Sequence, residues 1–271
     1  MASQLKKCEA FSLLHQQDQA FIIPNPWDLG SAKLLQGLGY KALATTSAGL
    51  AFALGRLDGN VTLEETLAHC SQLAEHINIP INVDFENGYS DDPETVAKNV
   101  LAVVETGVAG CSIEDFCAAK QTIYSFDLAV ERVQAAAEAV ANLDFPFQLT
   151  ARAENLFHGV NDTEDTIKRL KAFESAGANV LYAPGIASLA QLTEVTNELQ
   201  APFNVLAPFI KGASVKEFSN AGAARISVGG ALCFAAVNPI LNAGNEMLLK
   251  GTFEWINEVA PRNTVNELLI S

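Results

Sequence analysis

The chain has 271 residues, with 17 Lys or Arg against 31 Asp or Glu, so its formal net charge is −14. This acidity disfavours general attraction to nucleic acid or to anionic membrane surfaces. With 49% hydrophobic and 18% charged residues the chain can bury a large core, which excludes global disorder. No apolar run reaches the roughly 18 residues that a membrane-spanning helix needs.

Five scattered cysteines form no CxxC pair: they are Cys8, Cys70, Cys111, Cys117 and Cys233. An odd, unclustered set favours a reducing compartment over a disulfide framework or a zinc site. The first residues also lack the continuous apolar stretch of a secretory signal. We therefore expect a cytoplasmic protein.

From residue 20 onward, short apolar segments alternate with amphipathic ones. Nearly continuous apolar runs are typical of parallel strands that are covered on both faces. The predicted strands are Ala20–Pro26, Ala42–Ser47, Ile81–Glu86, Gly110–Asp115, Phe147–Glu154, Asn179–Ala183, Phe203–Ala207 and Arg225–Gly229.

The segments between these strands carry signals of helix starts and ends. Capping-box patterns at Thr62–Glu65, Ser188–Gln191 and Ser214–Glu217 predict helix N-termini. A glycine follows the last turn of several predicted helices, where a left-handed conformation is common. These glycines are Gly39, Gly107, Gly177 and Gly222.

Eight strand–helix units in one chain predict a single domain, 1–271, of the α/β class, a (β/α)8 TIM-type barrel over about 20–230. The competing doubly wound sheet usually has a glycine-rich phosphate loop after its first strand, and Pro24–Asp28 is not one. Helical residues continue over about 231–259, beyond what the barrel needs. We expect them to pack on a neighbouring subunit, which implies a homo-oligomer.

Acidic residues gather where the predicted strands end, which is where barrel active sites lie. Asp58 follows the second strand, Asp84 and Glu86 end the third, and Glu114 ends the fourth. Such carboxylates can simply cap the next helix, the alternative for Asp58 in particular. Several of them at one mouth repel each other unless a cation or a proton lies between them, and oxygen-only ligands suit Mg²⁺. The pattern therefore predicts a metal site.

Arg152 ends the fifth strand after an apolar run. It could form a salt bridge to one of these carboxylates, clamp a substrate carboxylate with its forked guanidinium, or do both. The small residues of Thr45–Gly49, after the second strand, form either a plain turn or a loop whose amides bind a carboxylate. His158, Cys117 and Tyr124 lie in loops after the fourth and fifth strands and are candidate proton donors.

Together, several short motifs resemble the isocitrate lyase / phosphoenolpyruvate mutase superfamily, in order over about residues 22–230. The resemblance implies an α/β barrel with Mg²⁺ or Mn²⁺, an α-keto acid bound to the metal, and dimers or tetramers that exchange a C-terminal helix. The motifs are Asn25–Asp28, Thr46–Gly49, Gly55–Gly59, Val83–Tyr89, Ile113–Asp115 and Thr150–Arg152.

Matched position by position, the resemblance implies that Asp58, Asp84, Glu86 and Glu114 surround the metal, partly through water. Glu86 stands where many members have aspartate. Arg152 matches the arginine beside the enolate oxygen. The residues implied to bind substrate are Trp27, Thr46, Ser47, Ala48, Asp58, Arg152 and Asn204.

The motifs with which the isocitrate and methylisocitrate lyases hold further carboxylates are absent. The loop after Glu114 lacks their Lys-Lys/Arg-Cys-Gly-His motif, and Tyr182–Gly185 lacks their glutamate. The resemblance thus implies a Mg²⁺-dependent lyase or hydrolase that cleaves a C–C bond of a small 2-oxo or 2-hydroxy acid through a pyruvate-type enolate, with C–P cleavage as the second possibility. Arg152 and Glu114 would act in catalysis, with Cys117, His158 or Tyr124 as proton donor. A pyruvate-dependent aldolase and a catalytically silent barrel that binds dicarboxylates are the alternatives.

Overall fold

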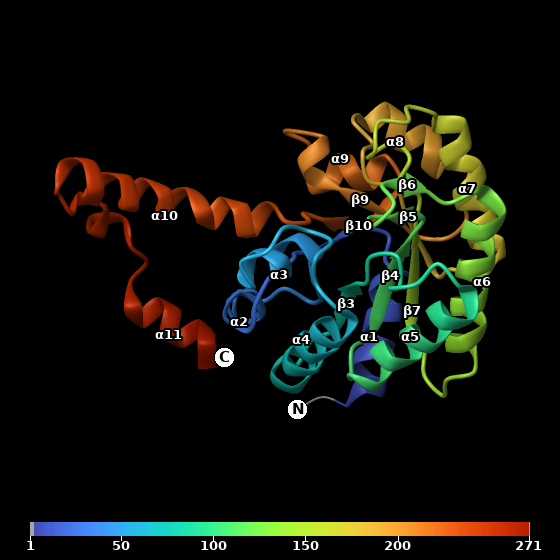
Figure 1. Ribbon diagram of the computed structural model, residues 1–271, viewed down its shortest axis with the longest axis horizontal. Helices are drawn as coiled ribbons and strands as arrows, with labels where there is room; N and C mark the ends of the chain where they lie inside the picture. Colours follow the sequence, from blue (N-terminus) through green and yellow to red (C-terminus); the bar gives the residue numbers. More distant parts are fainter. Residues whose placement is uncertain (1–2, 271) are drawn as a thin grey trace.

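Eight parallel strands form one sheet in the computed structural model, which describes residues 3–270 (Figure 1). Their order is β1-β10-β9-β8-β7-β4-β3-β2. A 3.1 Å hydrogen bond from the Ala44 amide to the Pro24 carbonyl joins the two edges, so the sheet nearly closes into a barrel. The strands are β1 (Phe21–Ile23), β2 (Leu43–Ala44), β3 (Ile81–Asp84), β4 (Gly110–Glu114), β7 (Gln148–Arg152), β8 (Val180–Tyr182), β9 (Phe203–Leu206) and β10 (Ala223–Ser227).

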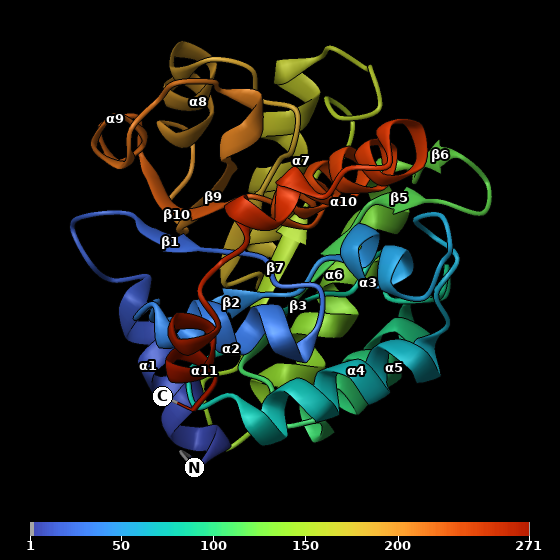
Figure 2. The ribbon, with the colours of Figure 1, turned by 90° about the vertical axis from the view of Figure 1, so that its left-hand side faces the viewer.

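The predicted (β/α)8 barrel is confirmed, and seven of the eight strands lie within their predicted segments. The eighth, β10, begins at Ala223, two residues before the predicted Arg225, and ends at Ser227. The strands are buried because helices cover their outer faces and side chains fill the barrel (Figure 2). The barrel helices are α2 (Leu29–Gly37), α3 (Ser47–Ala53), α4 (Leu63–His76), α5 (Pro93–Glu105), α6 (Phe126–Ala141), α7 (Thr163–Ser175), α8 (Leu189–Thr196) and α9 (Val215–Asn220).

The predicted helix boundaries form largely as the sequence indicates. Full capping boxes begin α4 at Thr62 and α9 at Ser214. At Ser188 the box is half formed, because the Gln191 side chain accepts a hydrogen bond from the Ala187 amide instead. The four predicted glycines all have positive φ, between 89° and 103°, so each helix ends in the left-handed turn that favours glycine.

Helix α1 (Gln4–Leu14), which the sequence pattern did not predict, closes the amino-end side of the barrel. Its Cys8 and Phe11 are fully buried against Ile23, Ala42, Ala44 and Ala109. The ammonium of Lys7 donates hydrogen bonds to the carbonyls of Ala74 and Ile77, at 2.9 and 2.6 Å, where α4 ends. The opposite end of the barrel, at the carboxyl ends of the strands, is not covered by α1 and can hold a functional site.

Two loops at the carboxyl ends of the strands contain regular structure. The segment Thr45–Gly49, interpreted as a loop, becomes helical at Ser47, the first residue of α3. After β4 the chain forms an antiparallel hairpin of β5 (Phe116–Cys117) and β6 (Thr122–Ile123). Both elements therefore border the barrel mouth more rigidly than open loops would.

The C-terminal segment is helical, as predicted, and much of it stands away from the barrel (Figure 1). It comprises α10 (Ala231–Lys250), the 3₁₀ turn η2 (Glu254–Glu258) and α11 (Arg262–Ile270), of which α11 returns to contact α2. Among residues 3–270 none of the helices has both the length and the hydropathy needed to cross a membrane.

Candidate active site

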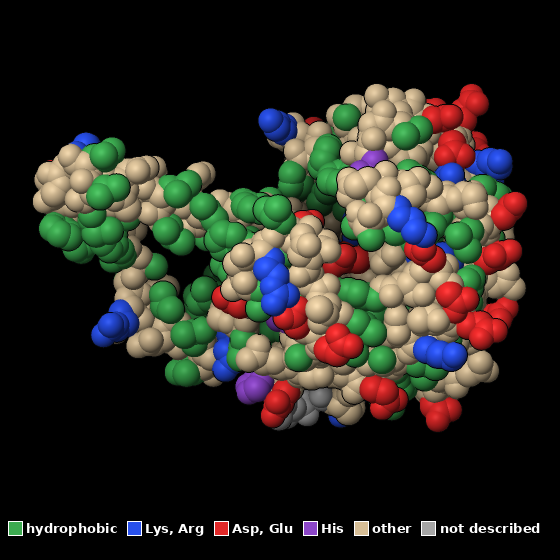
Figure 3. Space-filling model, in the orientation of Figure 1, with side chains coloured by type: hydrophobic (Ala, Val, Ile, Leu, Met, Phe, Trp, Pro, Cys, Tyr) green, Lys and Arg blue, Asp and Glu red, His purple; other side chains and the backbone are tan. Residues whose placement is uncertain are grey.

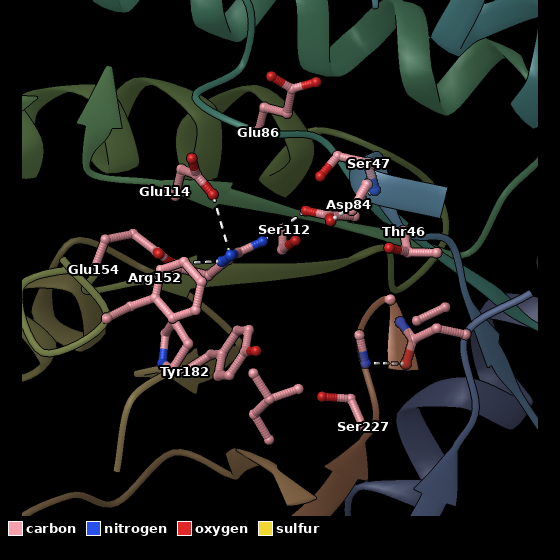
Figure 4. A pocket seen from close by; sticks show the side chains of 18 of the residues that line it. Thr46, Ser47, Asp84, Glu86, Ser112, Glu114, Arg152, Glu154, Tyr182 and Ser227 are labelled. Carbon is pink, nitrogen blue, oxygen red and sulfur yellow. Dashed lines mark hydrogen bonds and ion pairs between the residues drawn. The ribbon is translucent and has the colours of Figure 1, made fainter. Parts of the chain in front are cut away.

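A cavity of about 500 Å³ opens at the carboxyl ends of the barrel strands. Its wall includes the last residues of β3, β4, β7 and β8, which are Asp84, Glu114, Arg152 and Tyr182 (Figure 4). Catalytic residues of (β/α)8 barrels come from the same strand ends. This cavity is therefore the candidate active site.

Arg152 lies at the centre of the cavity wall, and its three nitrogens meet three different carboxylates. Nη1 is 2.6 Å from Asp84, Nη2 is 3.1 Å from Glu114 and Nε is 2.8 Å from Glu154. Burial alone would lower the pKa of Arg152, but these carboxylates outweigh it and raise the pKa above its usual range. The guanidinium is therefore a fixed positive charge in an otherwise acidic wall.

Asp84 is held from two sides. One oxygen binds Arg152, and the other accepts a 3.0 Å hydrogen bond from the Ser47 amide at the start of α3. Its own amide donates to the Thr45 hydroxyl at 2.8 Å. Because β2 and β3 are paired neighbours, the loop after β2 fixes the carboxylate that ends β3.

Glu86 does not continue the strand as expected. Strand β3 ends at Asp84, and Glu86 has a φ of +46°, in the left-handed region. Asp84 and Glu86 therefore do not share the face of one regular strand, and Figure 4 shows Glu86 set back from Arg152. Its carboxylate still lines the cavity, where it accepts a 3.2 Å hydrogen bond from the Tyr89 hydroxyl.

The carboxylates around the cavity repel one another. Burial, followed by the charges of Asp84 and Asp58, raises the pKa of Glu86 to about 7. Burial and then Asp84 likewise raise the pKa of Asp58, whose loop precedes α4. Arg152 compensates part of this negative charge, and the repulsion that remains between Asp58, Asp84 and Glu86 would be relieved by a cation.

Among residues 3–270, no three Asp, Glu, His or Cys side chains converge closely enough to hold a metal ion by themselves. Mg²⁺ commonly takes only one or two protein carboxylates and completes its shell with water and substrate oxygens. The donors of Asp58, Asp84 and Glu86 that line this cavity are carboxylate oxygens, which are the ligands a hard cation prefers. The residues present therefore fit Mg²⁺ or Mn²⁺.

Of the residues implied to bind substrate, Thr46, Ser47 and Ala48 line the cavity, whereas Trp27 does not. Thr46 caps α3, accepting a 3.3 Å hydrogen bond from the Gly49 amide. A Cβ on Gly49 would lie 2.7 Å from that of Trp27, so Trp27 packs behind the loop. Trp27 is therefore placed to support Thr46–Ala48 from behind.

The three candidate proton donors are not equivalent. His158 lines the cavity, where its ring stacks on Phe116 with centroids 3.5 Å apart. Burial and then the charge of Arg152 lower the pKa of His158, which favours the neutral form of its imidazole. Cys117 and Tyr124 do not line the cavity; the Tyr124 hydroxyl instead binds the side chains of Asn87 and Asp91.

Asn204 on β9 also lines the cavity, and it belongs to a buried polar group inside the barrel. Its amide donates to the Ser227 hydroxyl at 2.9 Å, and its oxygen accepts from Arg225 Nε at 2.8 Å. Arg225 further donates to the Thr150 hydroxyl at 3.2 Å. Asn204 is therefore fixed in one orientation.

Sequence reasoning missed two residues that shape the site. Glu154 is 1% exposed, binds Arg152, and has its pKa raised to about 7, chiefly by burial. Asn25 ties the strands together at the rim, because its side-chain oxygen accepts from the amides of Val228 and Gly229, both at 2.9 Å. Neither was given a role from the sequence, although Asn25 opens one of the motifs and Glu154 ends a predicted strand; a charged or amide side chain at a buried strand end was the available signal.

The fold and this cavity define the class: a (β/α)8-barrel protein with an acidic, arginine-containing pocket at the carboxyl ends of its strands. The family model described as phosphoenolpyruvate phosphomutase matches residues 11–248, and the chain belongs to that family. The family lies in the isocitrate lyase / phosphoenolpyruvate mutase superfamily, as the resemblance indicated, and its relatives are lyases or mutases that act on small carboxylates.

Known proteins resemble the chain over much of its length. It is 31% identical to 2-methylisocitrate lyase of Escherichia coli over 180 residues, which are 63% of this chain and 60% of that protein. A Burkholderia cenocepacia protein provisionally described as a lyase or mutase has a TM-score of 0.95 and 44% identity, covering 99% of this chain and 97% of that one. Oxaloacetate acetylhydrolase, solved with its product oxalate, has a TM-score of 0.86 and 25% identity, covering 98% of this chain and 94% of that one.

Proposed function

We propose that the protein is a Mg²⁺- or Mn²⁺-dependent lyase or hydrolase that cleaves a C–C bond of a small 2-oxo or 2-hydroxy acid through a pyruvate-type enolate. The observation that carries this proposal is the convergence of Asp58, Asp84, Glu86 and Glu114 on one cavity, around a single arginine. Kinship with 2-methylisocitrate lyase supports C–C cleavage. The oxalate complex of oxaloacetate acetylhydrolase supports a small carboxylate ligand.

The acidic side chains have separate parts in this proposal. Asp84 and Glu86 would hold the metal, and Asp58 and Glu114 would bind its water ligands. When bound, Mg²⁺ supplies Lewis acidity to a chelating substrate oxygen. Glu114 also forms an ion pair with Arg152, at 3.1 Å, so it would keep the guanidinium in place beside the reacting group.

Arg152 would stabilise the charge that develops on the enolate oxygen. Its positive charge is already fixed by three carboxylates, so it needs no reorganisation when the bond breaks. Thr46, Ser47 and Ala48 would bind the substrate carboxylate beside Asp84. His158 would exchange a proton with the C3 carbon of the enolate, because among the three candidate donors it alone lines the cavity.

The proposal is tested by assaying turnover of oxaloacetate and methylisocitrate with and without EDTA, and in Asp84→Ala. We expect chelation or the substitution to reduce kcat at least about 100-fold, because a bound metal contributes several kcal/mol to stabilising the transition state. Asp127→Ala, at an exposed position on α6, is the matched control and keeps full activity. Activity that survives both treatments would refute the metal role. Stabilisation by oxalate without turnover of any 2-oxo acid would indicate a binding protein instead.

We further propose that chains associate through the C-terminal segment. Figure 3 shows hydrophobic side chains gathered along α10 and the residues after it. Leu248 is 82% and Leu249 77% exposed, which is costly for a monomer in water. Exchange of α10 between neighbouring subunits would bury them. The large hydrophobic side chains exposed in this segment are Phe234, Ile240, Leu241, Met247, Leu248, Leu249, Phe253, Ile256, Val259 and Ile270.

A further inference from the structure

The cavity has two chemically different sides. The metal-binding and arginine side comes from β3, β4 and β7, with the loop after β2. The other side comes from the loops after β7, β8 and β9 and from the start of α10, and it is predominantly hydrophobic. We call this second side the apolar wall, and it consists of Phe157, Pro184, Leu206, Pro208, Phe209 and Phe234.

The apolar wall is built from large side chains that are open to water. Phe157 is 49%, Phe209 41% and Phe234 52% exposed. The rings of Phe157 and Phe209 meet edge to face with centroids 5.8 Å apart, and Phe157 also contacts the ring of His158. A ligand group that covered these rings would gain free energy from the apolar area removed from water.

No positive charge faces the apolar wall to receive a second anionic group. In the described part of the chain, the guanidinium groups that line the cavity belong to Arg152 and Arg225, and no lysine lines it. Arg152 is already bound by three carboxylates. Arg225 is 3% exposed and its nitrogens contact Asn204, Thr150 and His15, so it lies beneath the cavity floor.

The carboxylates of the cavity strengthen this asymmetry. Asp58, Asp84, Glu86, Glu114 and Glu154 all line it, and the positive charges beside them, Arg152 and a bound divalent cation, would lie on their side of the cavity and not at the apolar wall. A substrate carboxylate that chelated the metal would be attracted, whereas a second one placed against the apolar wall would find no partner and would be repelled.

We propose that the apolar wall receives the departing part of the substrate, and that this part is an uncharged aldehyde or ketone that carries an alkyl or aryl group. The substrate class is therefore a 4-hydroxy-2-oxo acid with one carboxylate and an apolar tail. When the C3–C4 bond breaks, its electron pair stays on C3 as the enolate, the C4 hydroxyl gives its proton to His158 and C4 departs as the carbonyl; return of that proton to C3 completes the cleavage. This inference rests on the proposed function, because that function places the oxo-acid head group against Asp84 and Arg152.

A matched pair of ligands tests the proposal without requiring turnover. 2-Oxo-5-methylhexanoate and 2-oxoglutarate share the oxo-acid head and chain length, and differ by an isopropyl group in place of the distal carboxylate. With Mg²⁺ present, calorimetry should give a Kd at least about 10-fold lower for the apolar ligand, because the isopropyl group gains from leaving water whereas the distal carboxylate would be buried without a partner. Oxalate serves as the probe for the head group alone.

Phe209→Arg should reverse the preference, because it places a cation in the apolar wall. Binding of 2-oxoglutarate should become the tighter of the two, while the Kd of oxalate stays unchanged. Phe157→Gln, at a half-exposed position, should weaken only 2-oxo-5-methylhexanoate and serves if Phe209→Arg does not fold. Leu13→Ala, on α1 at the opposite end of the barrel, is the control and leaves the ratio of the two Kd values as in the parent protein.

The outcomes separate this inference from the proposed function. If oxalate binds and the parent protein binds 2-oxoglutarate as tightly as its apolar partner, the inference is overturned and the proposed function stands. If oxalate does not bind in the presence of Mg²⁺, both are overturned. A change of oligomer mass in Phe209→Arg or Phe157→Gln, with the ratio of Kd values unaltered, would show that these rings contact another subunit instead, and would also overturn the inference.

Discussion

Arg152 is the residue on which the geometry of the acidic wall depends. Each of its three nitrogens meets a carboxylate from a different position: Asp84 on β3, Glu114 on β4 and Glu154 just after β7. A lysine carries its charge on a single nitrogen and cannot reach three separated carboxylates at once. At least one carboxylate would then lose its partner.

We therefore expect Arg152→Lys to lower kcat by about 10²–10³, the usual cost of losing one preorganised donor to a developing oxyanion. Steady-state turnover of the substrate found in the chelation assay measures this. Arg262→Lys, at an exposed position of α11, is the matched control. A fall in kcat of less than threefold in Arg152→Lys would show that the guanidinium only supports the structure.

His15 is a second residue whose surroundings predict a measurable effect. Its ring is 7% exposed, its Nδ1–H donates to the Phe11 carbonyl at 2.8 Å, and its Nε2 lies 3.4 Å from Arg225 Nη1. This arrangement suits a neutral imidazole that accepts from the arginine. Burial and then the charge of Arg225 lower the pKa of His15 to about 3.

A base whose pKa is lowered by folding binds protons more readily in the unfolded chain. The neutral His15 ring makes its full contribution to the free energy of unfolding above pH about 6.5, and this contribution is lost as the pH falls from 6.5 toward 3. Between pH 7 and pH 5 this amounts to about 2 kcal/mol. We expect the free energy of unfolding, measured by urea titration, to fall less between pH 7 and pH 5 in His15→Gln than in the parent protein, by roughly that amount. His76→Gln, on the exposed surface of α4, should keep the parent's pH dependence; equal slopes in all three proteins would contradict the lowered pKa.

The sequence identified the residue types of the site better than their contacts. The acidic residues and Arg152 were predicted as site residues because charged side chains are unusual at the ends of buried strands and indicate a binding or catalytic role. The three-way bonding of Arg152 depends on β7 lying beside β4 and on Glu114 pairing with Arg152 in register, which appears only after folding. The left-handed turn at Glu86 and the burial of Tyr124 away from the cavity likewise depend on tertiary contacts.

At the scale of elements, α1 stabilises the barrel from its amino-end side. Phe11 is fully buried, and its ring contacts those of His15 and Phe21 edge to face, with centroids 4.7 and 6.4 Å apart. Phe11→Ala should therefore lower the free energy of unfolding by about 3–5 kcal/mol, the usual cost of removing a buried phenyl ring. Denaturant titration provides the measurement. Leu13→Ala, two residues further along the same helix but 60% exposed, should change it by less than about 0.5 kcal/mol. Similar losses in the two variants would show that α1 does not seal the barrel.

The elements that the sequence predicted are those with strong local signals. The strands are apolar runs, and positive φ at Gly39, Gly107, Gly177 and Gly222 follows from chemistry within one turn. Helix α1 was missed because its apolar residues do not mark its buried face: Lys7 is buried with Cys8 and Phe11, whereas Leu5 and Leu13 are exposed. The β5–β6 hairpin was missed because each strand has only two residues, too few for any periodicity.

At the scale of the whole molecule, the barrel and the C-terminal segment differ in how they are stabilised. The barrel buries its hydrophobic residues within the chain, whereas α10 leaves the barrel rim and exposes a series of them (Figure 1, Figure 3). Helix α10 begins directly after β10, and its Phe234 belongs to the cavity wall. An assembly that covers α10 would therefore also affect the surroundings of the site.

Replacing both Leu248 and Leu249 by glutamate tests the proposed assembly. These residues are 82% and 77% exposed in the single chain, so the substitution costs the isolated subunit little, but it would bury two charges in an interface between subunits. We expect the parent protein to sediment as a dimer or tetramer and the double variant to dissociate by at least one step, with unchanged circular dichroism. Lys250→Glu, next along α10, changes the charge without removing a hydrophobic contact and should dissociate far less. A parent protein that stays monomeric at concentrations where oxalate still binds would mean that α10 has another role and that the cavity is complete within one chain.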